Sequence, residues 1–326
     1  MAQRPPEPAE LRMAACGVAE PSGPVQFLRL PRPPAPRPGE ILIDVLAAGV
    51  GPWDRLLFTG GWDVGLRFPA ALGVEGAGRV VAVGPDVTAP AVGDLVLAHS
   101  VPLPGHSGFW AEQALLLAAH AAPLPENLAP TQAAALPVNG LTAYQGLAEL
   151  QVSRGDRLLV TNGAGATGAL AVQLAVAAGA HVTATASPRS FERLRQLGAA
   201  EVVDYHSPAW PGQLGRTFDA ALTTAPGTAA VAADLVRSGG RLCSITSDAP
   251  SSTAELATTN LYVQPDAEAL ALLATRLRDG ALDLLVEALP LDAGPVAFER
   301  SAHGQTGGAK LVLRITGDEP TPPHAV

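Results

Sequence analysis

Cysteine is almost absent from this chain, which has only Cys16 and Cys243 among its 326 residues. Two cysteines cannot build a disulfide framework, and they are too few for a thiolate zinc site. No run of about 18 apolar residues occurs, so the sequence predicts no membrane span. The N-terminus lacks the basic start and apolar core of a signal peptide, and we therefore expect a cytoplasmic protein.

Basic residues are also scarce, and they never form a block. Lys and Arg total 21 against 30 Asp and Glu, which gives a formal net charge of −9. This balance disfavours nucleic acid as a partner. Lysine occurs once, at Lys310. Apolar residues, by contrast, make up 48% of the chain, which at this length is enough for two domains.

The chain changes character near residue 128. Before it, short strands and Gly/Pro turns predict a β-rich domain over 13–127. After it, strand-like and helix-like segments alternate up to 263, which is typical of a parallel sheet covered by helices. We expect 264–326 to return to the first domain and 1–12 to form a loose, proline-rich tail. The predicted fold class is α/β, with a doubly wound parallel-sheet domain inserted into a β-rich one.

A glycine-rich turn follows the strand expected at 157–161. Gly163, Gly165 and Gly168 have the spacing G-x-G-x-x-G before an expected helix at 169–178. Such glycines allow a tight turn, a close approach of pyrophosphate to the backbone, and close packing of helix on strand. Together with Ala166 and Thr167 they predict a phosphate cradle at the positive end of the helix. A purely structural turn is the alternative.

The residues after the next expected strand, 181–186, indicate which nucleotide binds. A NAD site usually has Asp or Glu there to bond the ribose hydroxyl. Here Ser187 and Arg189 follow instead, and a hydroxyl beside a guanidinium suits a 2′-phosphate. We therefore expect NADPH as the cofactor rather than NADH. The alternative for Arg189 is a solvated side chain with no ligand.

Seven short motifs then follow one another in a fixed order. They are 73–80 (GVEGAGRV), 92–96 (VGDLV), 108–112 (GFWAE), 134–137 (AALP), 141–144 (LTAY), 197–199 (LGA) and 308–313 (GAKLVL). In this order they resemble the zinc-free quinone oxidoreductase branch of the medium-chain dehydrogenase/reductase superfamily. The resemblance covers 13–315. It implies a GroES-like catalytic domain, a Rossmann NADP-binding domain over 128–263, and a homodimer formed through the Rossmann domain.

The resemblance also bears on metal. Zinc-dependent relatives carry Cys or His at positions where this chain has Gly51 and Val74. Without thiolate or imidazole ligands a tetrahedral zinc site is not expected, and we predict no metal. Reduction of an electrophilic acceptor then fits better than dehydrogenation of an alcohol, which needs a Lewis acid. Glu75 is expected to be structural and to hold its glycine turn.

The segment 48–54 (AGVGPWD) resembles the loop that lines the substrate cleft in this family. Many members have Asn where Gly51 stands, and a Tyr that often follows the loop is missing here, so no firm proton donor emerges. Asp54, Trp53 and Trp62 are our catalytic candidates, because flat conjugated substrates stack on tryptophan. The alternatives are that the tryptophans pack a core and that Asp54 caps a turn. His99 and His106 are weaker candidates for a proton donor.

The remaining expected cofactor contacts are Thr142 on the nicotinamide side, Tyr205 on the adenosine side, and Lys310. The predicted function is NADPH-dependent, zinc-independent reduction of a quinone or conjugated enone by hydride transfer. The expected partner is therefore a small conjugated carbonyl or quinone. Two alternatives remain: an enoyl-thioester or secondary-metabolite tailoring reductase, and a non-catalytic NADPH-binding sensor.

Overall fold

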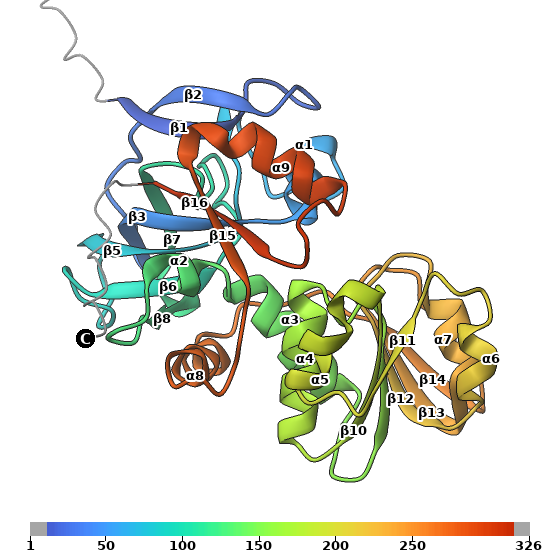
Figure 1. Ribbon diagram of the computed structural model, residues 1–326. Coiled ribbons are helices and arrows are strands. Elements are labelled where there is room, and N and C mark those ends of the chain that lie inside the picture. Colours follow the sequence, from blue (N-terminus) through green and yellow to red (C-terminus); the bar gives the residue numbers. More distant parts are fainter. Residues whose placement is uncertain (1–11, 316–326) are drawn as a thin grey trace, which may run out of the picture. The chain divides into compact units, whose positions relative to one another are not determined.

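The computed structural model describes residues 12–315, which form two compact units (Figure 1). Unit 1 holds the chain up to Pro137, Val286–Thr306 and the chain from Lys310 onward. Unit 2 holds Val138–Leu285 together with Gly307–Ala309. The expected tail at 1–12 lies outside the described residues except for Arg12, which begins the first strand.

Unit 1 is built on a seven-stranded sheet. Its strands are β3 (Glu40–Val50), β5 (Glu75–Val83), β6 (Leu95–His99), β7 (Gln113–Leu117), β8 (Ala121–Pro123), β15 (Val286–Pro290) and β16 (Lys310–Arg314). The long strand β3 pairs with β5, β7 and β16, and all pairings are antiparallel except that of β15 with β16. Strand β16, at the end of the described chain, therefore pairs with β3 in the N-terminal part of the chain, as the sequence predicts.

A second, antiparallel sheet of unit 1 joins β1 (Arg12–Val18) to β2 (Gln26–Pro31) and β4 (Ala70–Ala71). The helices of unit 1 are η1 (Pro52–Arg55), α1 (Leu56–Thr59), η2 (Ala118–His120), α2 (Pro130–Ala134), η4 (Leu291–Ala293) and α9 (Gly294–Ala302). In the core, the ring of Phe298 meets Phe58 and Trp110 edge-on, at 5.9 and 6.2 Å. Trp110 is fully buried and donates its indole N–H to Gly49 O, so it is a core residue.

Unit 2 contains a six-stranded parallel sheet in the order β11-β10-β9-β12-β13-β14. The strands are β9 (Arg157–Val160), β10 (His181–Ala186), β11 (Glu201–Asp204), β12 (Phe218–Thr223), β13 (Val236–Ser244) and β14 (Leu256–Asn260). The chain builds outward from β9 in one direction and then restarts at β12 in the other. This reversal is the topological switch point, where open α/β sheets bind ligands at the carboxyl ends of their strands.

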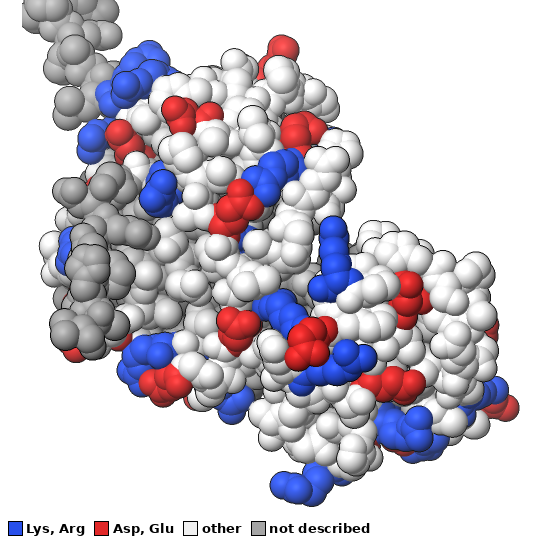
Figure 2. Space-filling model, in the orientation of Figure 1, with Lys and Arg blue, Asp and Glu red and all other residues white. Residues whose placement is uncertain are grey.

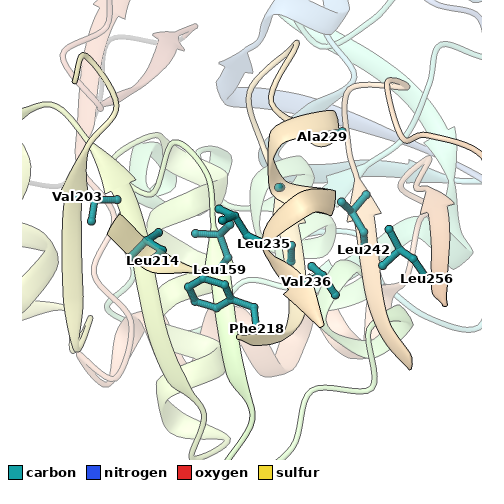
Figure 3. Close-up of a cluster of buried hydrophobic side chains, with 11 residues drawn as sticks. Leu159, Val203, Leu214, Phe218, Ala229, Leu235, Val236, Leu242 and Leu256 are labelled. Carbon is teal, nitrogen blue, oxygen red and sulfur yellow. The ribbon is translucent and has the colours of Figure 1, made fainter. Parts of the chain in front are cut away.

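Helices cover both faces of this sheet (Figure 1). The helices in this part of the chain are α3 (Pro137–Glu149), α4 (Ala166–Ala177), η3 (Pro188–Ser190), α5 (Phe191–Gln196), α6 (Trp210–Leu214), α7 (Ala229–Leu235) and α8 (Ala267–Arg278). Helices α4 and α5 lie on one face, and α6 and α7 lie on the other. Figure 3 shows the core under α6 and α7, where Leu159, Phe218 and Leu242 of three strands pack with Leu235 of α7. The predicted fold class is confirmed.

The boundaries between the units differ from the expected ones in two elements. Helix α2, expected in the second domain that begins at residue 128, belongs to unit 1, because unit 2 begins at Val138. The sequence placed everything after residue 263 in the first domain, but α8 belongs to unit 2. Helix α8 buries Leu270, Leu273 and Leu277 on one side. The chain on either side of α8 is tied to unit 2 through side-chain amides: Gln145 bonds the backbone of Gln264, and Gln173 bonds that of Asp283.

On the face drawn in Figure 2, acidic and basic side chains are interspersed among uncharged ones. Within residues 12–315, no helix is long and apolar enough to span a membrane.

Candidate functional site

The glycine-rich turn lies directly after β9, at the switch point of the unit 2 sheet. Gly165 is the N-cap of α4 in an extended conformation, so the helix begins three residues earlier than the sequence predicted. The first bond inside the helix runs from Ala169 N to Gly165 O at 2.8 Å. The N–H groups of Ala166, Thr167 and Gly168 precede it, and by helix geometry they have no partner within the helix.

The turn needs glycine for a second reason besides the close approach of pyrophosphate to the backbone, because a side chain at these positions would clash with neighbouring atoms. A Cβ on Gly168 would lie 2.3 Å from Asn162 O, and one on Gly163 would lie 2.8 Å from the Ala184 side chain on β10. The turn is held in place by bonds from Gly163 N to Thr185 O and from Gly165 N to Asn162 O. The structure therefore presents a hydrogen-bonded turn that leads into a helix N-terminus, and these features fit the pyrophosphate of a dinucleotide.

Two further segments contact this turn, and no local sequence pattern indicates either contact. Thr167 Oγ1 donates to Asn139 Oδ1 of α3 at 2.9 Å, which ties the first turn of α4 to a second helix. Thr142 is buried one helical turn after Asn139, so both side chains lie on the same side of α3. Gly308 has a φ of +89°, and a Cβ there would lie 2.7 Å from Ala164 O, so its backbone lies against the turn.

Ser187 and Arg189 follow β10, as expected. Ser187 is half-buried and Arg189 is exposed in η3. The Arg189 guanidinium has no hydrogen bond or ion pair with any residue between 12 and 315. Other arginines nearby are engaged: Arg193 pairs with Asp283 at 3.3 Å, and Arg195 pairs with Glu192. The uncommitted arginine is thus the one that the sequence assigned to the 2′-phosphate.

Tyr205 follows β11, the strand beside β10. Its ring lies against His206 at 4.1 Å between centroids, with 49% of the residue exposed. His206 is held by Asp204, whose carboxylate accepts both its backbone N–H and its Nδ1–H. The backbone bond from His206, aided by the imidazole, lowers the pKa of Asp204. The exposed ring of Tyr205 is suited to stacking against an adenine ring.

The loop before α1 in unit 1 is organised by Asp54. Its Oδ2 accepts the backbone N–H of Gly51 at 2.9 Å, and the residue is fully buried. Burial raises the pKa of Asp54 to about 7, against the lowering effects of the Gly51 bond and of the Lys310 charge. The capping role that the sequence offered as an alternative is therefore present. The backbone N–H of Gly73 also lowers this pKa, and Asp54 Oδ1 makes no closer hydrogen bond with any described residue.

Lys310 lies close to the same loop. Its Nζ donates to Glu75 Oε1 at 2.6 Å, and both side chains are almost completely buried. The same ammonium lies 4.4 Å from the ring centroid of Trp53. We expected Lys310 to contact the cofactor, but its amino group binds Glu75 within unit 1. We expected Glu75 to hold its glycine turn, and its side chain binds the Lys310 ammonium.

The other substrate-side candidates are less closely connected. Trp62 is half-buried after α1, and its backbone N–H donates to Leu56 O. His99 is buried on β6, with Nδ1 3.0 Å from Val74 O, so it is not an exposed loop histidine. His106 is half-buried in a turn, where its backbone N–H donates to Leu103 O.

The donor set around the loop does not suit zinc. The only buried Asp, Glu, His, Lys or Arg residues in the described chain are Asp54, Glu75, His99 and Lys310. One of these is a cation that already neutralises Glu75. No group of three or more His, Cys, Asp or Glu within residues 12–315 could hold a metal ion.

Comparisons with known proteins agree with this architecture. Residues 37–126 match the family described as alcohol dehydrogenase GroES-like domain, and residues 197–313 match the one described as zinc-binding dehydrogenase. The chain is 30% identical over 302 residues to the chloroplast envelope quinone oxidoreductase homolog of Arabidopsis thaliana, covering 86% of this chain and 91% of that protein.

Two further comparisons add detail. The chain is 38% identical over 167 residues to dehydrogenase azaJ of Aspergillus niger, covering 47% of this chain and 48% of that protein, so the match spans about half the length of this relative. The structure of the quinone oxidoreductase from Coxiella burnetii aligns with a TM-score of 0.83 at 28% identity, covering 94% of this chain and all of that one. The chain belongs to the medium-chain dehydrogenase/reductase superfamily of oxidoreductases.

Proposed function

We propose that this protein is an NADPH-dependent, zinc-independent reductase of quinones or conjugated enones. The observation that carries the proposal is the buried group in unit 1, where Lys310 neutralises Glu75 beside Trp53 and Asp54. Zinc-dependent relatives carry Cys or His where this chain has Gly51 and Val74, and the ammonium of Lys310 and the indole of Trp53 lie beside these two positions in the sequence or the fold. Similarity to quinone oxidoreductases along most of the chain supports the same activity.

The residues of unit 2 are suited to bind the cofactor. The unpartnered N–H groups of Ala166, Thr167 and Gly168 would accept the pyrophosphate at the helix N-terminus. Arg189, with Ser187 beside it, would hold the 2′-phosphate, and the exposed ring of Tyr205 would carry the adenine. Thr142 lies on the α3 surface that is bonded to the cradle, which suits the nicotinamide side. Bound NADPH supplies a hydride and becomes NADP⁺.

The residues of unit 1 would orient an acceptor that is already electrophilic. Hydride addition to a quinone or enone needs no Lewis acid when the acceptor is held close to the donor in a fixed orientation. The aromatic surface of Trp53 suits a flat conjugated molecule, and Trp62 remains a second candidate for this contact. The proton that completes the reduction comes from water in this proposal.

The activity is tested by following NADPH and NADH oxidation with quinones, enones and acyl thioesters. We expect turnover of quinones or enones with NADPH. Turnover restricted to acyl thioesters would instead indicate an enoyl-thioester or tailoring reductase. Tight NADPH binding without turnover of any acceptor would indicate a sensor.

The cofactor preference is tested with Arg189→Ala. Loss of a charge-assisted pair with the 2′-phosphate should weaken NADPH binding about 10- to 100-fold. NADH binding should hardly change, because NADH lacks that phosphate. Arg195→Ala is the matched control, since Arg195 is an exposed arginine already paired with Glu192. Titration calorimetry measures both cofactors, and equal losses for NADPH and NADH would contradict the assignment.

We also infer a homodimer formed through unit 2. Strand β14 is the edge of its sheet, and the unpaired N–H and C=O groups of an edge strand can pair with a second copy of the chain. Side chains of its own chain already bond part of this edge, because Ser252 and Thr253 bond the backbone of Thr258 and Leu256. The edge beyond them leads to Tyr262, which is 68% exposed. We place the contact there.

A further inference from the structure

The position of the Trp53 ring is set by the absence of a side chain at residue 51. A Cβ on Gly51 would lie 2.1 Å from Cε2 and 2.3 Å from Cζ2 of the Trp53 indole. Such contacts are impossible, so the ring occupies the space that any side chain at position 51 would need. The Trp53 ring can therefore occupy this position only because residue 51 is glycine.

Lys310 fixes the same ring. Its ammonium lies 4.4 Å from the ring centroid, a distance at which a cation is attracted to the π system. The ammonium cannot drift away, because Glu75 holds it at 2.6 Å and both groups are buried. A cation this close also withdraws electron density from the indole, which makes its N–H a stronger hydrogen-bond donor.

The indole N–H itself is buried and has no partner among residues 12–315. Buried indole N–H groups usually find an acceptor, and one left without an acceptor is costly. By contrast, the fully buried Trp110 in the core of the same unit does have its acceptor, Gly49 O at 2.8 Å. The unpaired N–H thus belongs to the candidate substrate loop and not to the core.

We propose that Trp53 Nε1 donates the hydrogen bond that holds the carbonyl oxygen of the acceptor during reduction. This inference rests on the proposed reductase function and names the residue that recognises its substrate. The acceptor gains a hydride from NADPH at carbon, its oxygen gains negative charge and then a proton from water, and NADP⁺ is left. The indole N–H, strengthened by Lys310, stabilises the oxygen as this charge develops.

The kinetic test compares Trp53→Phe with the wild-type enzyme. Phenylalanine keeps an aromatic ring above Gly51 and beside Lys310 but removes the N–H. We expect kcat/KM for the acceptor to fall about 10- to 100-fold. Removal of one oxyanion-hole donor in other enzymes lowers kcat by about 100- to 1,000-fold, so the expected loss is at or below the lower end of that range. The KM for NADPH should stay unchanged. Trp210→Phe is the matched control, because Trp210 lies in α6 of unit 2 and packs against its hydrophobic core.

A second variant covers the case in which Trp53→Phe does not fold. Gly51→Ala would push the indole from its place while leaving it chemically intact, and should lower kcat/KM for the acceptor in the same way. Gly212→Ala is its control, since a Cβ there would meet nothing within 4 Å.

Nuclear magnetic resonance gives a readout that does not depend on turnover. The four tryptophans of the chain give four indole N–H signals, and the Trp53 signal is the one lost in Trp53→Phe. In the NADP⁺ complex, we expect that signal alone to move downfield when the fastest-reduced quinone or enone is added.

The possible outcomes distinguish the proposed reductase function from the proposed role of Trp53. A wild type that reduces no acceptor refutes the proposed function and this inference with it. An active wild type whose Trp53 signal stays still at saturating acceptor, or a folded Trp53→Phe variant with unchanged kcat/KM, refutes the inference and leaves the function standing.

Discussion

The fully buried carboxyl group of Asp54 should make the stability of the protein depend on pH in a way that one substitution removes. Burial raises the pKa of Asp54 from 3.8 to about 7. Between these values the native state keeps a proton that the unfolded chain has lost. By linkage, the free energy of unfolding then falls as pH rises across that interval, and above about pH 7 both states are ionised and the fall stops.

The magnitude follows from the size of the interval. One pKa unit corresponds to about 1.4 kcal/mol, so an interval of about three units gives a total of roughly 4 kcal/mol. Two charged groups face the carboxyl and set its pKa with burial: Lys310 lowers it and Glu75 raises it. Asp54→Asn keeps an oxygen for the Gly51 N–H but cannot ionise, so the variant should lack this dependence.

The assay is equilibrium unfolding in urea at several pH values between 4.5 and 8. The free energy of unfolding of Asp54→Asn minus that of the wild type should rise by about 1.4 kcal/mol per pH unit up to about pH 7 and then level off. Asp292→Asn, an exposed acid in the same unit, is the control. A flat difference over this range, or one that falls with pH, would refute the reasoning.

Three further outcomes can be measured directly. Lys310→Met should cost about 3–5 kcal/mol in urea unfolding by leaving Glu75 buried without its cation, and adding Glu75→Gln should recover most of that loss; a single variant as stable as wild type would contradict the ion pair. Gly168→Ala should lower Tm and abolish NADPH binding measured by calorimetry, because its Cβ would lie 2.3 Å from Asn162 O; retained tight binding would argue against the cradle. Tyr262→Asp should shift the protein from dimer to monomer in analytical ultracentrifugation, and an unchanged mass would place the interface elsewhere.

The sequence predicted unit 2 closely because its determinants are local. Strand 181–186 is β10 residue for residue, and the glycines 163, 165 and 168 lie between β9 and the first turn of α4. In unit 2, alternating apolar strands and helices mark the parallel sheet, and the glycine turn needs no distant partner. Helix α4 begins at Ala166, three residues before the predicted start, because its first turn is part of the glycine-rich segment, which lacks the apolar pattern of a helix.

The site in unit 1 could not be predicted in the same way, because its contacts join residues far apart in the chain. Lys310 and Glu75 are separated by 235 positions, and no local pattern announces that they pair. The sequence showed that Gly51 replaces a common Asn, but it could not show that the Trp53 ring fills the space. The family resemblance placed Asp54 in the cleft loop, whereas its raised pKa depends on burial that only the fold reveals.

The burial of Lys310 determines which basic groups the protein presents to solvent. It is the chain's one lysine, and it is 4% exposed, so practically no side chain offers a primary amine to solvent. Reagents and enzymes that modify lysine find almost no target on the native fold. Among residues 12–315, the exposed basic side chains other than histidine all carry guanidinium groups, which stay charged at any physiological pH and bind carboxylate or phosphate through two parallel hydrogen bonds.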